Sequence, residues 1–531
     1  MAILNNTLSR RSFLTTGATL VAAGMAVPSF IAETARLFDS GVQFVPTAHA
    51  AGRKILVIVQ LAGGNDGLNT LIPMNNAAYT AARPNIAIPT AQVLSLNGSV
   101  GLHPSMTRLK ARYDQGQMAV VQGVSYPNPN RSHFRGTDIW ESAVPTRLES
   151  KGWMGRYLEA CGCGRPDHLE AMTVGSSQTA GAFWTEMALV PAVASISSFR
   201  YTSVNSGSSN SAVAQRNAEI ATLRNALAQS EGTAQGELLR QSILTALTDA
   251  DILSAAAASY SPKGSYPANT FGNSMKLIAQ LVAADVGTSI FYVSLGGFDT
   301  HSGQLATHAN LLTTLDQAIE GFLYDMESVN RLGDVTLMTF SEFGRRVAQN
   351  GSSGTDHGVA APMFVVGGGV AGGLHGTYPS LSDLTSGDLK MSVDFRSVYQ
   401  AVLEKWLNIP SGSILEGSYP TLPLFAEPVN CTPRPAVRVT TTASGGRLNV
   451  TVTAGGGMVR SVRFGPTQNA LVDVGAQTSL TGTFTHTPPA AAPQITFSVR
   501  RQAAGATTVP IKVTDDCGQW DTFVGGGPGA F

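Results

Sequence analysis

Charge and cysteine are both scarce in this sequence. Only 13% of its 531 residues are charged, and 35 lysines and arginines balance 35 aspartates and glutamates, so the formal net charge is zero. Without an excess of positive charge the chain has no electrostatic footprint for nucleic acid. Four cysteines are too few to staple a chain of this length, and none has the paired spacing of a zinc site. These absences exclude a nucleic-acid binder, a disulfide scaffold and a cysteine-based zinc site.

Long hydrophobic runs are lacking as well. The apolar stretch from Leu14 to Val27 has about 14 residues, fewer than the roughly 20 that cross a bilayer. It follows SRRSFL at Ser9 to Leu14, and two adjacent arginines before a mild apolar run are typical of a twin-arginine export signal. We therefore predict a signal peptide over residues 1–50, ending at Ala48-His49-Ala50, and a mature protein in the periplasm or outside the cell. A retained membrane helix is the alternative.

Apolar runs of strand length recur through residues 51–430. The first, KILVIVQL, is almost continuously β-branched or aliphatic, as in a parallel strand that is buried on both faces. Between Gly303 and Leu332 apolar residues recur every three or four positions, which predicts a long amphipathic helix. Since such runs alternate with helical segments, we expect an α/β domain with a mostly parallel central sheet. The predicted strands are Lys54–Leu61, Met118–Gln122, Ser289–Leu295, Val335–Phe340 and Met363–Val366.

The composition changes over residues 431–531. Threonine, valine and glycine dominate there, short alternating runs appear, and helix signals vanish. This pattern predicts an all-β, immunoglobulin-like sandwich of about 100 residues. In an oxidising compartment Cys431 and Cys517 could pair within it. For Cys161 and Cys163 the sequence leaves both a strained bridge and reduced thiols open.

Polar side chains follow most of the predicted strands. The motifs are GGNDGLNT, GGFDTH, SEFGR and GTDHG, and their glycines let the backbone approach a ligand closely. Because the carboxyl ends of parallel strands meet at one edge of a sheet, these acids and imidazoles would crowd together there, which favours a divalent cation such as Zn, Mn, Mg or Ca. A single aspartate after two glycines is more often a turn or N-cap residue, but four such motifs in one chain favour a metal site. The candidate metal ligands are Asp66, Asp299, His301, Glu342 and His357.

A candidate nucleophile lies in the segment YPNPNRSHFRGTDIWE, which follows the second predicted strand. Ser132 would lie near the start of a helix, where unpaired backbone N–H groups favour an anion and lower the cost of an alkoxide. Arg131 and Arg135 flank it and could neutralise a phosphate or sulfate oxyanion. The alternative, which the sequence leaves equally open, is that Ser132 only caps the helix.

The ordered motifs carry a resemblance to a known family. GGNDGLNT, RSHF, GGFDTH, SEFGR and GTDHG, with the twin-arginine leader, resemble the bacterial family domain of unknown function 1501 (DUF1501) over residues 1–410. That family is similar to the alkaline phosphatase and sulfatase superfamily, whose members hold one or two divalent metals at the carboxyl edge of an α/β sheet. The resemblance implies an alkaline-phosphatase-like sandwich fold, with Ser132 as nucleophile. It also implies metal-ligand roles for Asp66, Asp299, His301, Glu342 and His357.

The chain departs from the superfamily pattern in three places. One residue separates Asp299 from His301, where the superfamily usually has three. Phe343 stands where a histidine would follow the acid, which could leave one full metal site and a weak second one, or His133 could supply the missing nitrogen. No cysteine that could mature to formylglycine lies near Ser132, which disfavours sulfatase chemistry by that route.

Two hypotheses follow from these observations. The first is an exported, metal-dependent hydrolase that acts on small-molecule or polymer-linked phosphate or related esters. Its candidate catalytic residues are Ser132, Arg131, Arg135 and His133. The second is a non-catalytic metal- or ligand-binding envelope protein whose β-sandwich attaches to a glycan or cell-envelope surface. Eight basic and four acidic residues after position 430 give that region a mild positive bias, which suits an anionic surface.

Overall fold

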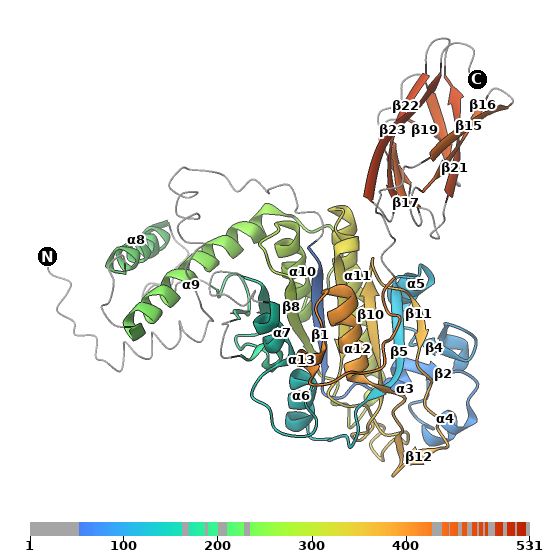
Figure 1. Cartoon of the computed structure of the whole chain (residues 1–531). Coiled ribbons are helices and arrows are strands. Elements are labelled where there is room, and N and C mark those ends of the chain that lie inside the picture. Colours follow the sequence, from blue (N-terminus) through green and yellow to red (C-terminus); the bar gives the residue numbers. More distant parts are fainter. Residues whose placement is uncertain are drawn as a thin grey trace. The chain divides into compact units, whose positions relative to one another are not determined.

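The chain forms two compact units, Met1–Phe425 and Ala426–Phe531, each described here by itself (Figure 1). The predicted export signal and its cleavage site lie outside the residues that the structure describes, as do Cys163, Cys431 and Cys517. Cys161 is disulfide-bonded. The computed structural model describes residues 53–161, 169–185, 190–199, 210–227, 234–426 and 438–526, the last range without 445–446, 455–458, 465–469, 475–476, 482–483, 487–493, 503–506 and 516–517.

A sheet of mostly parallel strands forms the middle of the first unit. Its strands lie in the order β11-β5-β10-β9-β1-β8-β6-β7, and β14 pairs with β5 at one end. Neighbouring strands are parallel except at β10, which runs antiparallel to both β5 and β9. The predicted α/β class with a mostly parallel sheet is confirmed. The strands are β1 (Ile55–Ala62), β5 (Met118–Ser125), β6 (Ala171–Val174), β7 (Ala192–Val193), β8 (Ile290–Gly296), β9 (Val335–Phe340), β10 (Ala361–Gly367), β11 (Gly373–His375) and β14 (Val393–Asp394).

Helices cover both faces of this sheet. Successive side chains of a strand point to opposite faces, so Val57 and Val59 of β1 join one core and Leu56 and Ile58 join the other. This burial on both sides explains why the first strand is apolar along its whole length. The first core is completed by α5 (Thr107–Asp114), α10 (Thr270–Ala283) and α11 (Gln304–Ser328), and the second by α6 (His133–Ser142), α7 (Trp153–Cys161) and α12 (Phe395–Ala401). The predicted amphipathic helix is thus confirmed as α11.

The reversed direction of β10 keeps both ends of the loop that precedes it at one edge of the sheet. Ala361, at the start of β10, pairs with Val124 near the end of β5, and Val366 pairs with Leu337 near the start of β9. The segment 341–360, which joins β9 to β10, therefore begins and ends at the edge where the segments after β1, β5 and β8 also lie. Every candidate site residue predicted from the sequence belongs to one of these four segments.

Shorter elements flank the sheet. A small antiparallel sheet joins β2, β4 and β3, and β12 and β13 form a two-stranded hairpin. Two further helices, α8 (Asn210–Ala226) and α9 (Ala234–Ser259), precede α10. No helix among the described residues is both long and apolar enough to cross a membrane. The remaining elements are α3 (Gly67–Thr70), β2 (Leu71–Pro73), α4 (Ala77–Ala82), β3 (Leu94–Ser95), β4 (Val100–Leu102), β12 (Leu384–Thr385), β13 (Asp388–Leu389) and α13 (Gly412–Leu415).

The second unit is entirely built of antiparallel strands in the part that the structure describes. One sheet has the order β15-β16-β21-β18-β19 and the other β20-β17-β22-β23. Leu448, Val450 and Val452 alternate along β16 and pack in a core with Val462 and Ile511 of the other sheet. An all-β C-terminal unit is confirmed, while its immunoglobulin-like character stays a prediction. The strands are β15 (Arg438–Ser444), β16 (Arg447–Thr453), β17 (Val459–Phe464), β18 (Ala470–Val474), β19 (Gln477–Leu480), β20 (Phe484–His486), β21 (Gln494–Arg501), β22 (Thr507–Asp515) and β23 (Gly518–Gly526).

Candidate metal centre

The loops after β1 and β8 approach each other closely at the carboxyl edge of the sheet. Gly63 has a φ of +119°, in the region that favours glycine, and a Cβ built on it would lie 2.4 Å from the backbone nitrogen of Asp299. The amide of Phe298 also donates a hydrogen bond of 3.1 Å to the carbonyl of Ala62. The position of Asp299 therefore depends on a residue without a side chain at position 63.

Replacing Gly63 by alanine should be markedly more destabilising than an equivalent change at an open position. Gly98 is the matched control, because it also has a positive φ (+84°) but no atom within 4 Å of the added Cβ. Both variants carry backbone strain, but only Gly63→Ala also forces two loops apart, so it should lose about 1–3 kcal/mol more of unfolding free energy. Urea denaturation of the two variants measures this difference, and equal losses would contradict the close packing of the loops.

Asp299 lies at the centre of a group of imidazoles. Its Oδ1 atom is 3.0 Å from Nε2 of His301 and 3.2 Å from Nε2 of His357, and its Oδ2 atom is 3.4 Å from Nε2 of His133. Burial alone would raise the pKa of Asp299, but the adjacent Arg345 and the imidazoles outweigh it and lower the pKa to about 2. Asp299 is therefore a carboxylate at any physiological pH.

Hydrogen bonds fix the protons of two of these imidazoles. Nδ1 of His357 lies 2.9 Å from the carbonyl oxygen of Arg131, and Nδ1 of His301 lies 3.3 Å from Oδ1 of Asp356. Because both partners can only accept, each Nδ1 donates to its partner, and each Nε2 faces Asp299, where it can bind a cation when it carries no proton. Burial lowers the pKa of His357 more than its hydrogen bonds raise it, which favours the neutral ring.

The third imidazole, His133, is oriented by a carboxylate. Its Nδ1 lies 2.9 Å from Oε1 of Glu342, which is almost completely buried and also accepts a hydrogen bond of 2.8 Å from the amide of Gly63. His133 therefore donates through Nδ1 and turns its Nε2 toward Asp299. A carboxylate behind an imidazole is the usual arrangement that orients a metal-binding histidine. Glu342, predicted as a direct ligand, thus lies behind His133.

The converging atoms fit a divalent cation. Ligand atoms of His133, Asp299 and His357 all lie within 4.8 Å of one another, and the Nε2 atoms of His301 and His357 are 3.0 Å apart. The Nε2 atoms of His301 and His357 face each other and the carboxylate of Asp299, and a cation among them would be bound by all three groups. Imidazole and carboxylate donors together suit Zn²⁺ or Mn²⁺.

Arg345 lies directly beside this group, and the sequence did not single it out. Its fully buried guanidinium donates to Oδ1 of Asp299 at 2.6 Å and lies 3.4 Å from Nε2 of His301. It also donates to four backbone carbonyls, at Gly63, Gly64, Phe298 and Thr355, and so links the loops of the site. The motif SEFGR contains this arginine three residues after Glu342, and that position is its only signal in the sequence.

Asn350 was also missed. Its side-chain amide donates to the carbonyl of His301 at 2.9 Å and to Oδ1 of Asp356 at 3.1 Å. Asn350 therefore links the backbone of His301 to Asp356, the carboxylate that orients the ring of His301. No local sequence signal marks this residue, because both of its partners come from other parts of the loops.

The structure does not bring Asp66 into the imidazole group. Its Oδ1 accepts from the amides of Leu68 and Asn69 as the N-cap of α3, and its Oδ2 pairs with Arg83 at 2.6 Å and accepts from Gln304. Both oxygens are thus occupied in a fully buried ion pair. Burial by itself raises the pKa of Asp66, but Arg83 and the hydrogen bonds outweigh it and lower the pKa. Asp66 takes the N-cap role that the sequence held open as its alternative.

Ser132 begins α6 without capping it. The residue occupies the N-cap position, but its side chain accepts no hydrogen bond from the helix, and the residue is exposed. Its neighbours on both sides reach the imidazole group, Arg131 through its carbonyl to His357 and His133 through its own ring. Ser132 therefore lies between two residues that contact the imidazole group, and its hydroxyl is free of the capping role that the sequence left open.

The two arginines that flank Ser132 are engaged elsewhere. The guanidinium of Arg131 pairs with the buried carboxylate of Asp388 on β13. Arg135 donates to the carbonyls of Val144, Pro145 and Arg147, where it secures the turn after α6. These contacts direct both guanidiniums toward other parts of the protein, which does not support the predicted role of holding a substrate oxyanion.

Phe343 packs as one wall of the site. Its ring centroid lies 5.0 Å from that of His133 and 4.5 Å from that of His357, and a Cβ at Gly64 would come within 2.4 Å of its ring. It therefore limits the movement of both imidazoles. Phe343 itself gives the site an apolar contact and no ligand atom. The nitrogen beside it is that of His133, which is one of the two alternatives that the sequence left open at this position.

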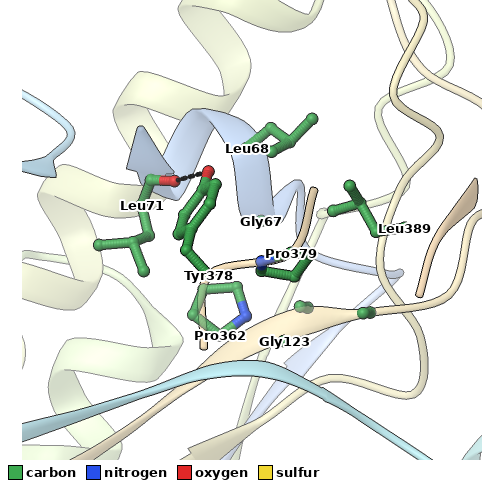
Figure 2. Close-up of a pocket in the computed structure, with 10 residues that line it drawn as sticks. Gly67, Leu68, Leu71, Gly123, Pro362, Tyr378, Pro379 and Leu389 are labelled. Atoms are coloured by element: carbon green, nitrogen blue, oxygen red, sulfur yellow. Dashed lines mark hydrogen bonds between the residues drawn. The ribbon is translucent and has the colours of Figure 1, made fainter. Parts of the chain in front are cut away.

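A separate small pocket lies between α3 and β10 (Figure 2). Its side chains are apolar apart from Tyr378, whose hydroxyl donates to the carbonyl of Leu71 at 2.8 Å. No charged side chain lines it, so it offers no ligand for a cation or an oxyanion. The lining residues are Gly67, Leu68, Leu71, Gly123, Ala360, Ala361, Pro362, Tyr378, Pro379 and Leu389.

Comparison with known proteins identifies a family for most of the first unit. The family model described as "Protein of unknown function (DUF1501)" matches residues 53–408. This match confirms the resemblance inferred from the ordered motifs. No curated protein matches the chain.

Several solved structures are distantly similar to this chain. One is a protein in the alkaline phosphatase superfamily from Vibrio parahaemolyticus, with 8% identity, a TM-score of 0.33 and coverage of 78% of this chain and 81% of the other. The PsFucS1 sulfatase from Pseudoalteromonas sp. has 10% identity, a TM-score of 0.30 and coverage of 87% of each chain. The phosphonate monoester hydrolase of Agrobacterium radiobacter has 7% identity, a TM-score of 0.30 and coverage of 76% and 86%.

Proposed function

The chain belongs to the DUF1501 family, and from the geometry of its site we propose that it is a metal-dependent hydrolase of phosphate or related esters. The observation that carries this proposal is the fixed orientation of the imidazoles. His133 and His357 each use Nδ1 to donate to an oxygen of the protein, so their Nε2 atoms converge on Asp299. Three protein ligands with a further position left for water or substrate are typical of a hydrolytic metal site.

The residues of the chain have distinct roles in this proposal. His133, Asp299 and His357 would hold the cation, while Glu342 and the carbonyl of Arg131 keep the two rings oriented. A bound divalent cation polarises an ester oxygen and makes a nucleophilic oxygen easier to deprotonate. Ser132 presents its hydroxyl from the start of α6, where the backbone N–H groups favour negative charge on that oxygen.

Metal analysis combined with ester assays tests the proposal. The purified chain should contain a tightly held divalent cation by elemental analysis. It should hydrolyse a phosphomonoester, phosphodiester or sulfate ester model substrate, and a chelator should abolish that activity. Re-addition of Zn²⁺ or Mn²⁺ should restore it. A chain that binds no cation from a metal-supplemented buffer would contradict the proposal at its first step.

Replacing Ser132 by alanine tests the nucleophile separately. Because the hydroxyl makes no capping bond, the variant should keep its unfolding free energy to within about 0.5 kcal/mol. It should also keep its cation but lose ester hydrolysis by at least a factor of about 100, since an attacking group is gone. Ser380→Ala, at an exposed serine outside the described site, is the control. Unchanged turnover in Ser132→Ala would reject the nucleophile and leave the metal site standing.

One observation favours a second candidate, a non-catalytic metal- or ligand-binding envelope protein. The guanidiniums of Arg131 and Arg135 are bound to Asp388 and to backbone carbonyls, so neither faces a substrate oxyanion. In this alternative the C-terminal β-unit attaches the protein to a glycan or cell-envelope surface. A chain that binds a cation and hydrolyses none of the three ester classes would favour it over the hydrolase.

Export by the twin-arginine pathway to the periplasm or beyond is part of the proposal. Its support is the segment SRRSFL and the mild apolar run after it. Replacing Arg10 and Arg11 together by lysine should retain the precursor in the cytoplasm, as measured by cell fractionation. Export of this variant at an unchanged level would contradict the assignment.

A further inference from the structure

We propose that the site binds a single divalent cation, through His133, Asp299 and His357, and that the buried guanidinium of Arg345 takes the place of a second one. The inference rests on the metal-dependent function proposed above and deepens it. The number of cations was open in the sequence, where one or two sites were both consistent with the motifs.

The two oxygens of Asp299 have different partners. Oδ1 accepts from Arg345 at 2.6 Å and has two further imidazole nitrogens within 3.2 Å. Oδ2 has Nε2 of His133 as its neighbour, at 3.4 Å. The Oδ1 side of the carboxylate, which faces both His301 and His357, thus already has the guanidinium of Arg345 beside it. The side that faces His133 has a nitrogen acceptor beside it and is the one where a cation is required.

Arg345 cannot easily leave this position. Its side chain is fully buried, and four backbone carbonyls from three loops accept its N–H groups. A guanidinium stays protonated in proteins and presents its donors in a fixed plane, so it acts as a permanent cation of fixed geometry. A divalent ion bound between Asp299 and His301 would lie against this charge and would be strongly repelled.

The formal charges of the site balance with one divalent ion. Asp299, Glu342 and Asp356 contribute three negative charges, and Arg345 contributes one positive charge. The imidazoles are neutral when they bind a metal through Nε2. A single divalent cation therefore brings the site to zero, whereas two would leave an excess of two positive charges in a partly buried cluster, which is costly. Asp66 does not change this balance, because it is paired with Arg83.

The inference assigns His301 a different role from His133. The Nε2 atom of His301 lies 3.0 Å from Oδ1 of Asp299 but also 3.4 Å from the guanidinium of Arg345, so a cation bound there would lie against a fixed positive charge. We therefore expect it to be a positioning residue for Asp299 and His357. Its loss should weaken cation binding by less than about 10-fold, below the usual range for a residue that directly orients a ligand.

Metal stoichiometry and affinity provide the test, without any need for turnover. The purified full chain, stripped with chelator and titrated with Zn²⁺ in a calorimeter, should bind one ion per chain. His301→Ala should still bind one ion with nearly the same affinity, while His133→Ala should lose at least about 100-fold, beyond the effect of losing an orienting residue. Two tight ions in the wild type, or equal losses in the two histidine variants, would overturn the inference and leave a metal-dependent function intact. No bound ion at all would overturn both proposals.

A direct test of Arg345 removes its charge. Arg345→Gln should allow a second Zn²⁺ to bind, because the guanidinium no longer occupies the side of Asp299 that faces His301. Arg396→Gln is the matched control, since Arg396 is also a largely buried arginine that pairs with a carboxylate, Asp394, at 2.6 Å. This control should bind one ion. If Arg345→Gln is folded, as judged by circular dichroism, and still binds one ion, the inference is contradicted. If the variant does not fold, the number of ions bound by the wild type and the affinity of His301→Ala test the inference.

Discussion

Replacing His357 by alanine should remove nearly all affinity of the site for a divalent cation. The ring supplies one of three converging ligand atoms, and its Nδ1 is held by the carbonyl of Arg131. We expect the affinity for Zn²⁺ to fall by more than the roughly 10- to 100-fold that is usual when only an orienting partner is lost. Calorimetric titration of the stripped chain measures the loss.

Two further variants make this prediction specific. Glu342→Gln should fall in the 10- to 100-fold range, since Glu342 only orients His133 through Nδ1. His375→Ala should leave the affinity unchanged, because His375 lies on β11 and its Nε2 faces the carbonyl of Ala371. The expected order of losses is thus His357, then Glu342, then His375. A loss in Glu342→Gln as large as that in His357→Ala would make Glu342 a direct ligand, as the sequence predicts, and would contradict the orientation seen here.

The fold could be predicted from the sequence because its signals are local. Five apolar runs became strands of the central sheet, and the three- to four-residue spacing between Gly303 and Leu332 became α11. Apolar periodicity depends on neighbours a few residues apart, and those residues are visible in the sequence. The direction of β10 was less accessible, because an apolar run reads the same for either direction. The segment 341–360 between β9 and β10 contains no helix. Because parallel strands are usually joined by a crossover helix, the lack of one indicates that β10 runs antiparallel to β9.

The candidate site could be predicted only in part, because its decisive contacts are not local. The motifs indicated that Asp299, His301 and His357 would meet, and the structure places them in contact. They did not indicate that Glu342 would face His133, 209 residues away in the chain. An acidic side chain can bind a metal or form an ion pair, and the residue that lies beside it in the fold determines which of the two it does. The partners become adjacent only when the sheet brings its loops to one edge.

Asp66 shows this limit most clearly, and it leads to the prediction with the largest expected effect on stability. Replacing Asp66 by alanine should lower the free energy of unfolding by about 3–5 kcal/mol, because it leaves the guanidinium of Arg83 buried without its partner. The amides at the start of α3 also lose their cap. Urea denaturation measures the loss. Asp114→Ala is the control, since its pair with Lys110 is exposed and follows i,i+4 spacing, where about 0.3–0.5 kcal/mol is usual.

The pH dependence of stability and the binding of metal distinguish an ion-paired Asp66 from a metal ligand. The fold lowers the pKa of this carboxyl, so its stabilisation is fully present above the unfolded-state pKa, near 3.8, and is lost as the pH falls through the lower value of the folded state. The wild-type chain should therefore lose stability relative to Asp66→Ala as the pH drops below about 4. At neutral pH, any Asp66→Ala chain that folds should still bind Zn²⁺ at His133, Asp299 and His357. Normal stability with loss of the cation would instead return Asp66 to the metal site.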